Sequence, residues 1–224
     1  SDRTTYRCGK LIRVLEPTAL SCDLTPNINN PKQRVMLVGN SHSDSIKATF
    51  LERAQLVSSK LFFMVPNDPL MTDSVSAKDV IDDAVSKKVN KLVLHYKSFS
   101  ISNGAIFDIV SLSEKANIKV FFIEPVPIWS INIPGAMYQN FIEGAQTIEK
   151  MTNLDYANYN LKQLDFVRSI ESKNFTTVSV VEYFCNPECE YSNNNGAPLY
   201  FDSHHLTITG SSRLRSVFDN ILLK

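Results

Sequence analysis

The sequence is poor in glycine and has no excess of either charge. Only seven of its 224 residues are glycine. None forms the glycine-rich loop that holds nucleotide phosphates, so nucleotide binding is unsupported, and no cofactor or catalytic metal is expected. Lysine plus arginine and aspartate plus glutamate number 23 each, which gives a formal net charge of zero. Because nucleic-acid-binding proteins usually carry a basic excess, no nucleic-acid partner is expected.

Long hydrophobic runs and internal repeats are also missing. The apolar run Val120–Ile123 stops at Glu124 and Pro125, far short of the about 20 residues that a membrane helix needs. The chain begins with Ser1 rather than methionine and shows no signal peptide, so we interpret it as a mature or excised piece. Its 224 residues are enough for one sizeable core but not comfortably for two.

Cysteine is scarce, but its four copies form two local pairs. Cys8 and Cys22 bracket a segment near the N-terminus, and Cys185 and Cys189 bracket the sequence Asn-Pro-Glu. This pattern predicts the disulfides Cys8–Cys22 and Cys185–Cys189 and therefore an oxidising compartment. Free thiols and a four-cysteine zinc site are the alternatives, although neither pair has the Cys-x-x-Cys spacing of zinc knuckles.

What the sequence does contain is an alternation of short apolar runs and amphipathic patterns. Apolar runs that predict strands cover 35–38, 61–65, 91–96, 120–123 and 177–181. Helical periodicity covers 45–58, 79–89, 106–116, 156–170 and 210–223, whereas 129–153 is polar and weakly patterned. This alternation predicts an α/β fold, a three-layer sandwich with a central, mostly parallel five-stranded sheet and helices on both faces.

A polar turn follows the first of these strands. Gly39, Asn40 and Ser41 connect that strand to the next helix, and open parallel sheets carry their sites at the carboxyl ends of the strands. A serine there would present its hydroxyl at the sheet edge, while its backbone N–H at the helix N-terminus could stabilise an oxyanion. The turn is not a Gly-x-Ser-x-Gly elbow, because position 43 is serine. The alternative is that Ser41 only caps the helix.

A carboxylate and two histidines lie just before the last predicted helix. Asp202 precedes His205 by three residues. On a tight turn this spacing can bring the carboxylate to the imidazole Nδ1 and leave Nε2 free to take the proton of Ser41. The pattern therefore favours a catalytic triad. A metal site is the alternative, and its plausible ligands are His42, Asp44, Asp202, His204 and His205.

The two motifs together resemble those of the SGNH hydrolase superfamily. The segment Gly39–His42 is similar to its Gly-Asp-Ser-His motif, and Asp202–His205 is similar to its Asp-x-x-His block. The closer resemblance is to the periplasmic SGNH domains fused to membrane-bound acyltransferases that O-acetylate bacterial surface polysaccharides. This resemblance implies an SGNH/flavodoxin-like fold, in which 1–33 is a disulfide-bearing lead-in and 34–224 is the catalytic domain.

The resemblance also implies a role for each residue of the triad. Ser41 would be the nucleophile, His205 the base, and Asp202 the group that orients the base. Spacing alone does not choose between the adjacent histidines, and only the resemblance selects His205 over His204.

Around the triad the sequence departs from the family pattern. Asn40 stands where the family has aspartate, a residue thought to support the turn. The oxyanion-hole glycine and asparagine of the superfamily have no clear equivalents, which leaves the Ser41 backbone and Lys97 as the candidate donors. His42 and His204 are candidate substrate-binding residues, and local structural roles are their alternative.

The function that the resemblance implies is O-acyl transfer. An acetyl group would pass through an acyl-serine to a sugar hydroxyl of a bacterial surface polysaccharide such as lipopolysaccharide. The partners would be an acetyl donor, a carbohydrate acceptor and a fused or docked membrane acyltransferase domain. The location would be the periplasm, with the full-length protein tethered to the inner membrane. The alternatives are a carbohydrate esterase or deacetylase with the same triad, and a non-catalytic carbohydrate-binding module with an inert triad.

Overall fold

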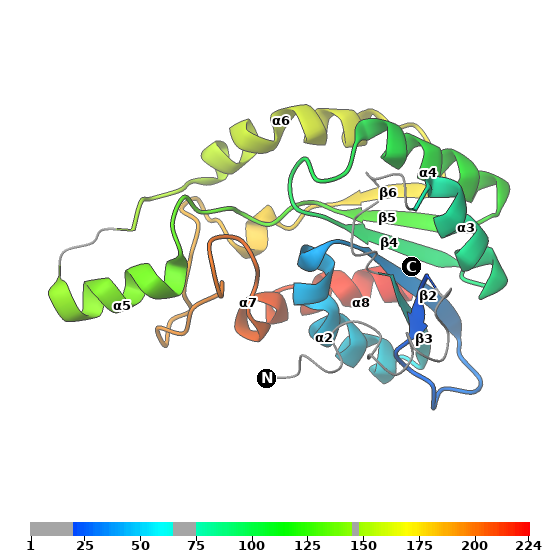
Figure 1. Cartoon of the computed structure of the whole chain (residues 1–224), viewed down its shortest axis with the longest axis horizontal. Helices are drawn as coiled ribbons and strands as arrows, with labels where there is room; N and C mark the ends of the chain where they lie inside the picture. Colours follow the sequence, from blue (N-terminus) through cyan, green and yellow to red (C-terminus); the bar gives the residue numbers. More distant parts are fainter. Residues whose placement is uncertain (1–19, 65–74, 145–147) are drawn as a thin grey trace.

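A central sheet lies between two layers of helices in the computed structural model, which describes residues 20–64, 75–144 and 148–224 (Figure 1). Its strands are β1 (Cys22–Asp23), β2 (Gln33–Gly39), β3 (Ser59–Met64), β4 (Lys91–His95), β5 (Lys119–Ile123) and β6 (Phe175–Val178). They form one six-stranded sheet in the order β1-β3-β2-β4-β5-β6. The β1–β3 pair is antiparallel and the other pairs are parallel. The predicted three-layer, mostly parallel α/β fold is confirmed.

The helices divide between the two faces of the sheet. On one face lie α2 (Ser41–Leu56), α7 (Ile208–Ser212) and α8 (Arg215–Leu223), and on the other lie α3 (Ala77–Ser86), α4 (Asn103–Lys115) and α6 (Asn153–Ser169) (Figure 1). The remaining α-helix of the described residues, α5 (Ile133–Glu143), extends away from the sheet beyond the ends of the strands (Figure 1). The chain thus covers both faces of the sheet and leaves the carboxyl edge open for loops.

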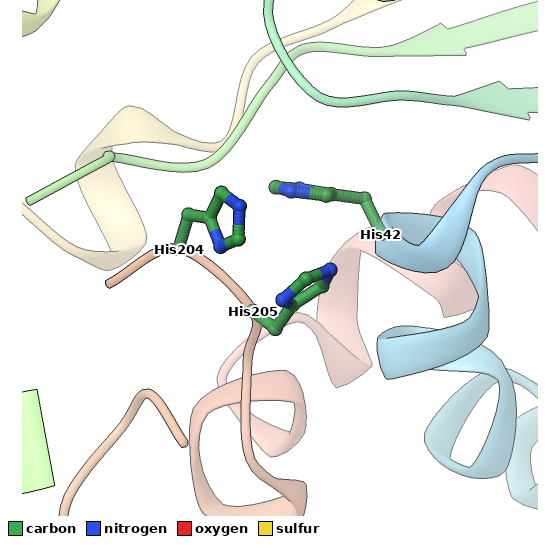
Figure 2. A group of neighbouring side chains, drawn as sticks. All are labelled: His42, His204 and His205. Carbon is green, nitrogen blue, oxygen red and sulfur yellow. The ribbon is translucent and has the colours of Figure 1, made fainter. Parts of the chain in front are cut away.

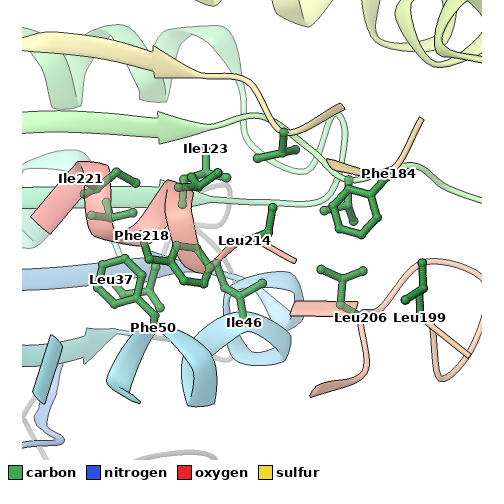
Figure 3. Packing of buried hydrophobic residues seen from close by; sticks show 14 of the residues in the cluster. Leu37, Ile46, Phe50, Ile123, Phe184, Leu199, Leu206, Leu214, Phe218 and Ile221 are labelled. Atoms are coloured by element: carbon green, nitrogen blue, oxygen red, sulfur yellow. The ribbon is translucent and has the colours of Figure 1, made fainter. Parts of the chain in front are cut away.

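Each buried strand contributes to two hydrophobic cores because successive side chains point to opposite faces. In β2, Leu37 belongs to the core under α2 and α8, whereas its neighbour Met36 belongs to the core under α3, α4 and α6. Figure 3 shows Leu37 packed with Phe50 of α2 and Phe218 of α8. The centroids of the two phenylalanine rings are 5.0 Å apart. Burial on both faces explains why β2 is a continuous apolar run in the sequence.

The sheet has one strand more than the five predicted. The additional strand, β1, consists of two residues that pair with Phe62 and Phe63 at the edge of the sheet. So short a segment has no periodicity of its own, and its extended conformation depends on the pairing with β3. The predicted boundary between a lead-in (1–33) and a catalytic domain (34–224) stays a prediction.

Four other elements differ from the sequence expectation. Helix α2 begins at Ser41 rather than at residue 45, and the segment 129–153 contains α5. The last strand covers 175–178 and is followed by a 3₁₀ turn at Val181–Tyr183. The closing helix is divided into α7 and α8. Polar caps explain the first two differences. Asn40 and Asn132 accept backbone N–H bonds at the starts of α2 and α5, and these caps define helix ends that apolar periodicity does not reveal.

The cysteine and membrane predictions can be compared with the described residues only. Cys185 and Cys189 form the expected disulfide. Cys8 lies outside the described residues, so its predicted pairing with Cys22 stays a prediction. Among the helices of the described ranges, none has both the length and the apolar character required to cross a bilayer.

Candidate active site

The turn that presents Ser41 depends on a glycine and a second serine. Gly39 ends β2, and a Cβ atom at this position would lie only 1.9 Å from the carbonyl oxygen of His95 and 2.1 Å from Ser43 Oγ. The hydroxyl of Ser43 donates to that same carbonyl at 2.7 Å. This close approach joins the first turn of α2 to the carboxyl ends of β2 and β4. It places Ser41 at the exposed edge of the sheet.

Asn40 organises the backbone around the nucleophile. Its side-chain oxygen accepts the His42 N–H at 3.0 Å, as an N-cap does, and the Lys97 N–H at 3.4 Å. Ser41 is the first residue of α2, so its own N–H has no acceptor within the helix. This amide is therefore available to an oxyanion. The Lys97 amide is directed at Asn40, which competes with the oxyanion-hole role predicted for Lys97.

Asp202 lies in a tight turn that a short antiparallel contact closes. Tyr200 and Leu206 form an isolated β-bridge that closes the turn. The backbone N–H of Trp129 donates to the carbonyl oxygen of Ser203 at 2.8 Å, which connects the turn to the segment after β5. Both Tyr200 and Trp129 are buried, and their rings pack edge to face. The aromatic packing beneath the turn holds its polar residues at the surface.

The structure brings Asp202 and His205 of this turn and Ser41 of α2 into one hydrogen-bonded chain. Asp202 Oδ2 is 2.6 Å from His205 Nδ1, and His205 Nε2 is 2.7 Å from Ser41 Oγ. The nucleophile and base candidates come from positions 164 residues apart in the sequence. The arrangement has the connectivity that a triad requires, with the carboxylate and the hydroxyl on opposite nitrogens of one imidazole.

The same carboxylate also binds His204. Asp202 Oδ1 accepts the backbone N–H groups of His204 and His205, each at 2.8 Å, and lies 2.9 Å from His204 Nδ1. Burial raises the pKa of Asp202, but these backbone and side-chain hydrogen bonds outweigh burial and hold the pKa well below its usual value. An ionised carboxylate can only accept. Each neutral histidine therefore carries its proton on Nδ1 and has an unprotonated Nε2.

His42 lies beside the triad and is buried. Its ring is fully buried, with a centroid 4.9 Å from that of His205 and 5.2 Å from that of His204. Burial, and secondarily the charges of neighbouring groups led by His95, lower the pKa of His42 well below its usual value. Within the described part of the chain, neither ring nitrogen of His42 has a hydrogen-bond partner. Its predicted role in substrate binding stays a prediction.

Of the five metal ligands considered from the sequence, three histidines converge. Figure 2 shows His42, His204 and His205 facing one another across the gap between the start of α2 and the Asp202 turn. Asp44 instead forms a salt bridge with Lys47 at 2.8 Å. Asp202 contacts the Nδ1 atoms of His204 and His205, so it does not lie beside their Nε2 atoms.

Two residues of the site were missed by sequence reasoning. Ser43 was considered only as a departure from the hydrolase elbow, although its position four residues after Gly39 on a helix start predicts a contact with the sheet. Phe201 stacks on His205 with ring centroids 5.1 Å apart and an interplanar angle of 12°. Its signal in the sequence was an aromatic residue directly before Asp202.

Comparisons with known proteins identify the family of the chain. Residues 14–220 match the family model described as SGNH domain (fused to AT3 domains). The chain belongs to this SGNH domain family. No curated protein matches the chain.

Among solved structures, this SGNH domain is similar to the periplasmic domain of a lipopolysaccharide acetyltransferase from Salmonella ser. Paratyphi A. The two are 18% identical, with a TM-score of 0.63 over 100% of this chain and 98% of that chain. At this identity the similarity concerns the fold alone. The family match confirms the SGNH resemblance and spans both the Ser41 turn and the Asp202 turn.

Proposed function

We propose that this SGNH domain is a serine-dependent O-acetyltransferase that acetylates a sugar hydroxyl of a bacterial surface polysaccharide such as lipopolysaccharide. The observation that carries the proposal is the hydrogen-bonded chain from Asp202 through His205 to Ser41. The carboxylate holds the imidazole in the tautomer whose Nε2 accepts the Ser41 proton, which is the arrangement that activates a serine.

The reaction follows from this geometry in two balanced steps. Ser41 Oγ attacks the carbonyl carbon of the acetyl donor while His205 Nε2 takes the hydroxyl proton, and the imidazolium gives that proton to the departing group. The sugar hydroxyl then attacks the acetyl-serine, loses its proton to His205, and the proton returns to Ser41 Oγ as the ester forms. The Ser41 N–H stabilises the oxyanion in both steps, and Phe201 supports the transient cation by stacking on it.

The partners and location follow from the family and from the similar structure. The family description pairs such domains with AT3 domains, so the acetyl donor would be delivered by a membrane acyltransferase domain of the same protein. The similar Salmonella domain is periplasmic and belongs to a lipopolysaccharide acetyltransferase. A periplasmic location, with a tether to the inner membrane, agrees with the Cys185–Cys189 disulfide.

Hydrolysis is the second candidate function. Ser41 is exposed, so water can reach an acetyl group bound to it. A carbohydrate esterase would use the same residues and differ only in the acceptor. The two functions separate when acetyl-enzyme is formed with labelled acetyl donor in the presence of polysaccharide. Label in the sugar supports transfer, whereas release of all label as acetate with every acceptor supports the esterase.

Replacing Ser41 tests the nucleophile. Ser41→Ala should lower the hydrolysis of p-nitrophenyl acetate by at least about a thousandfold and leave the melting temperature nearly unchanged, because only one exposed hydroxyl is lost. Ser212→Ala is a matched control, since among the described residues this hydroxyl bonds only to a carbonyl of its own helix α7. A fluorophosphonate probe should label the parent and the control but not Ser41→Ala. An unlabelled parent would instead favour the non-catalytic carbohydrate-binding module.

A further inference from the structure

Three imidazole rings meet beside the proposed nucleophile. One nitrogen from each of His42, His204 and His205 lies within 4.8 Å of the other two. The rings approach from two sides, His42 from α2 and the other two from the Asp202 turn (Figure 2). The triad uses His205 alone, so the convergence of the other two rings on it is unexplained by acyl transfer.

The donor atoms of this cluster are prepared for a cation. Asp202 accepts hydrogen bonds on the Nδ1 side of both His204 and His205, which leaves both Nε2 atoms unprotonated; that of His205 contacts Ser41 Oγ at 2.7 Å. A carboxylate behind an imidazole in this way is the usual outer support of histidines that bind zinc. His42 is buried, and its ring nitrogens have no hydrogen-bond partner among the described residues, so it offers the third lone pair without losing a protein contact.

We propose that His42, His204 and His205 form a binding site for Zn²⁺ that inhibits the enzyme. Three neutral imidazoles are a zinc ligand set with one position left for water. The hard cations Mg²⁺ and Ca²⁺, which prefer oxygen ligands, should not bind there. Zn²⁺ on His205 Nε2 takes the lone pair that accepts the Ser41 proton, so metal binding and catalysis exclude each other. The inhibitory part rests on the proposed function, whereas the binding part does not.

The site needs only side-chain adjustment to close around the ion. Zinc–nitrogen bonds of about 2.0–2.1 Å in a tetrahedral site place the ligand nitrogens roughly 3.4 Å apart. The nitrogens of this cluster lie within 4.8 Å of one another, so rotations of the imidazoles bring them to that spacing. Closing the site breaks the 2.7 Å contact between His205 and Ser41.

Titration calorimetry on protein without a polyhistidine tag tests the binding directly. We expect one Zn²⁺ per chain and no heat with Mg²⁺. His204→Ala and His42→Gln should each weaken Zn²⁺ binding by at least about tenfold. His95→Gln is the matched control, because His95 is the one histidine of the sequence that the cluster does not include. Circular dichroism of each variant verifies the fold. Absence of binding up to about 100 µM Zn²⁺, or an affinity that neither substitution changes, overturns the site.

Activity separates this inference from the proposed function. Saturating Zn²⁺ should abolish p-nitrophenyl acetate hydrolysis by the parent enzyme, and EDTA should restore it. Hydrolysis that Zn²⁺ leaves unchanged or increases would overturn the inhibition. A protein that binds Zn²⁺ through these histidines but never hydrolyses ester would contradict the proposed function and leave the metal site standing.

Discussion

At the residue scale, the candidate site is organised by one carboxylate. Asp202 accepts four hydrogen bonds from two adjacent histidines, two of them from backbone N–H groups. The backbone bonds fix the carboxylate to the turn, so it orients the imidazoles without relying on any other element. Only His205 extends from this carboxylate to Ser41. The two histidines therefore share a partner but differ in what their second nitrogen reaches.

Substitution of each histidine should reveal this difference. His205→Ala should lower kcat/KM for p-nitrophenyl acetate by at least about a thousandfold, since the base is lost. His204→Ala should lower it by less than about tenfold, because Asp202 keeps both backbone bonds and its bond to His205. Steady-state kinetics in metal-free buffer measure both values. If the two variants exchange ranks, the base is His204 and the proposed triad is displaced by one residue.

At the scale of elements, the loop that carries the disulfide leads from the sheet to the Asp202 turn. The Cys189 N–H donates to Met151 O at 2.7 Å, and the Asn153 N–H donates to Pro187 O at 2.8 Å, so the loop packs on the start of α6. The Leu199 N–H donates to Tyr191 O at 2.8 Å and continues the connection to the catalytic turn. The disulfide thus stiffens the segment of backbone that leads to Asp202.

Removing this disulfide should affect activity more than stability. In the double variant Cys185→Ala/Cys189→Ala, a loop this short contributes about 2 kcal/mol in the chain-entropy model. The melting temperature should therefore fall by roughly 4–8 °C, a few degrees for each kcal/mol. The kcat for p-nitrophenyl acetate should fall by about tenfold or more at 25 °C, because a small displacement of the turn separates His205 from Ser41. An unchanged kcat together with a larger thermal loss would show that the bond serves the fold alone.

At the scale of the whole molecule, two buried histidines make stability depend on pH. His95 ends β4 and is fully buried, with Nδ1 3.3 Å from the carbonyl oxygen of Ile123. Burial lowers the pKa of His95 to about 4, although the hydrogen bond to Ile123 opposes the shift. Burial also lowers the pKa of His42. The unfolded chain therefore binds protons more readily than the native state below pH about 6.5.

Acidification should consequently destabilise the protein between pH about 6.5, the pKa of histidine in the unfolded chain, and pH about 4, the pKa of His95 in the folded protein. The contribution of His95 is fully present above pH about 6.5 and is lost as the pH falls toward 4, which amounts to about 2 kcal/mol between pH 7 and pH 5. Urea unfolding at both pH values measures the loss. His95→Gln, whose amide can still donate to Ile123, should show a pH dependence smaller by about that amount. A variant with the same pH dependence as the parent would exclude His95 as the cause.

Much of the fold was predictable because local pattern and burial agree. The strands β2, β4 and β5 are buried on both faces, so they had to be apolar runs. The edge strand β1 and the helix α5 were not predictable in this way. A two-residue strand exists only through its partner β3, and α5 has few buried residues to give it a pattern.

For the candidate site, the sequence by itself determined the residue types and the local spacings. Asp202 and His205 are close enough along the chain for their hydrogen bond to form within one turn, and Asn40 is placed to cap the helix that begins at Ser41. Only the tertiary structure decided which histidine meets the serine and that His42 joins them. Those contacts cross 164 residues of sequence. They form because α7, which follows the Asp202 turn, packs on α2, where Thr49 and Ser211 share a hydrogen bond, and so brings the turn next to the end of β2.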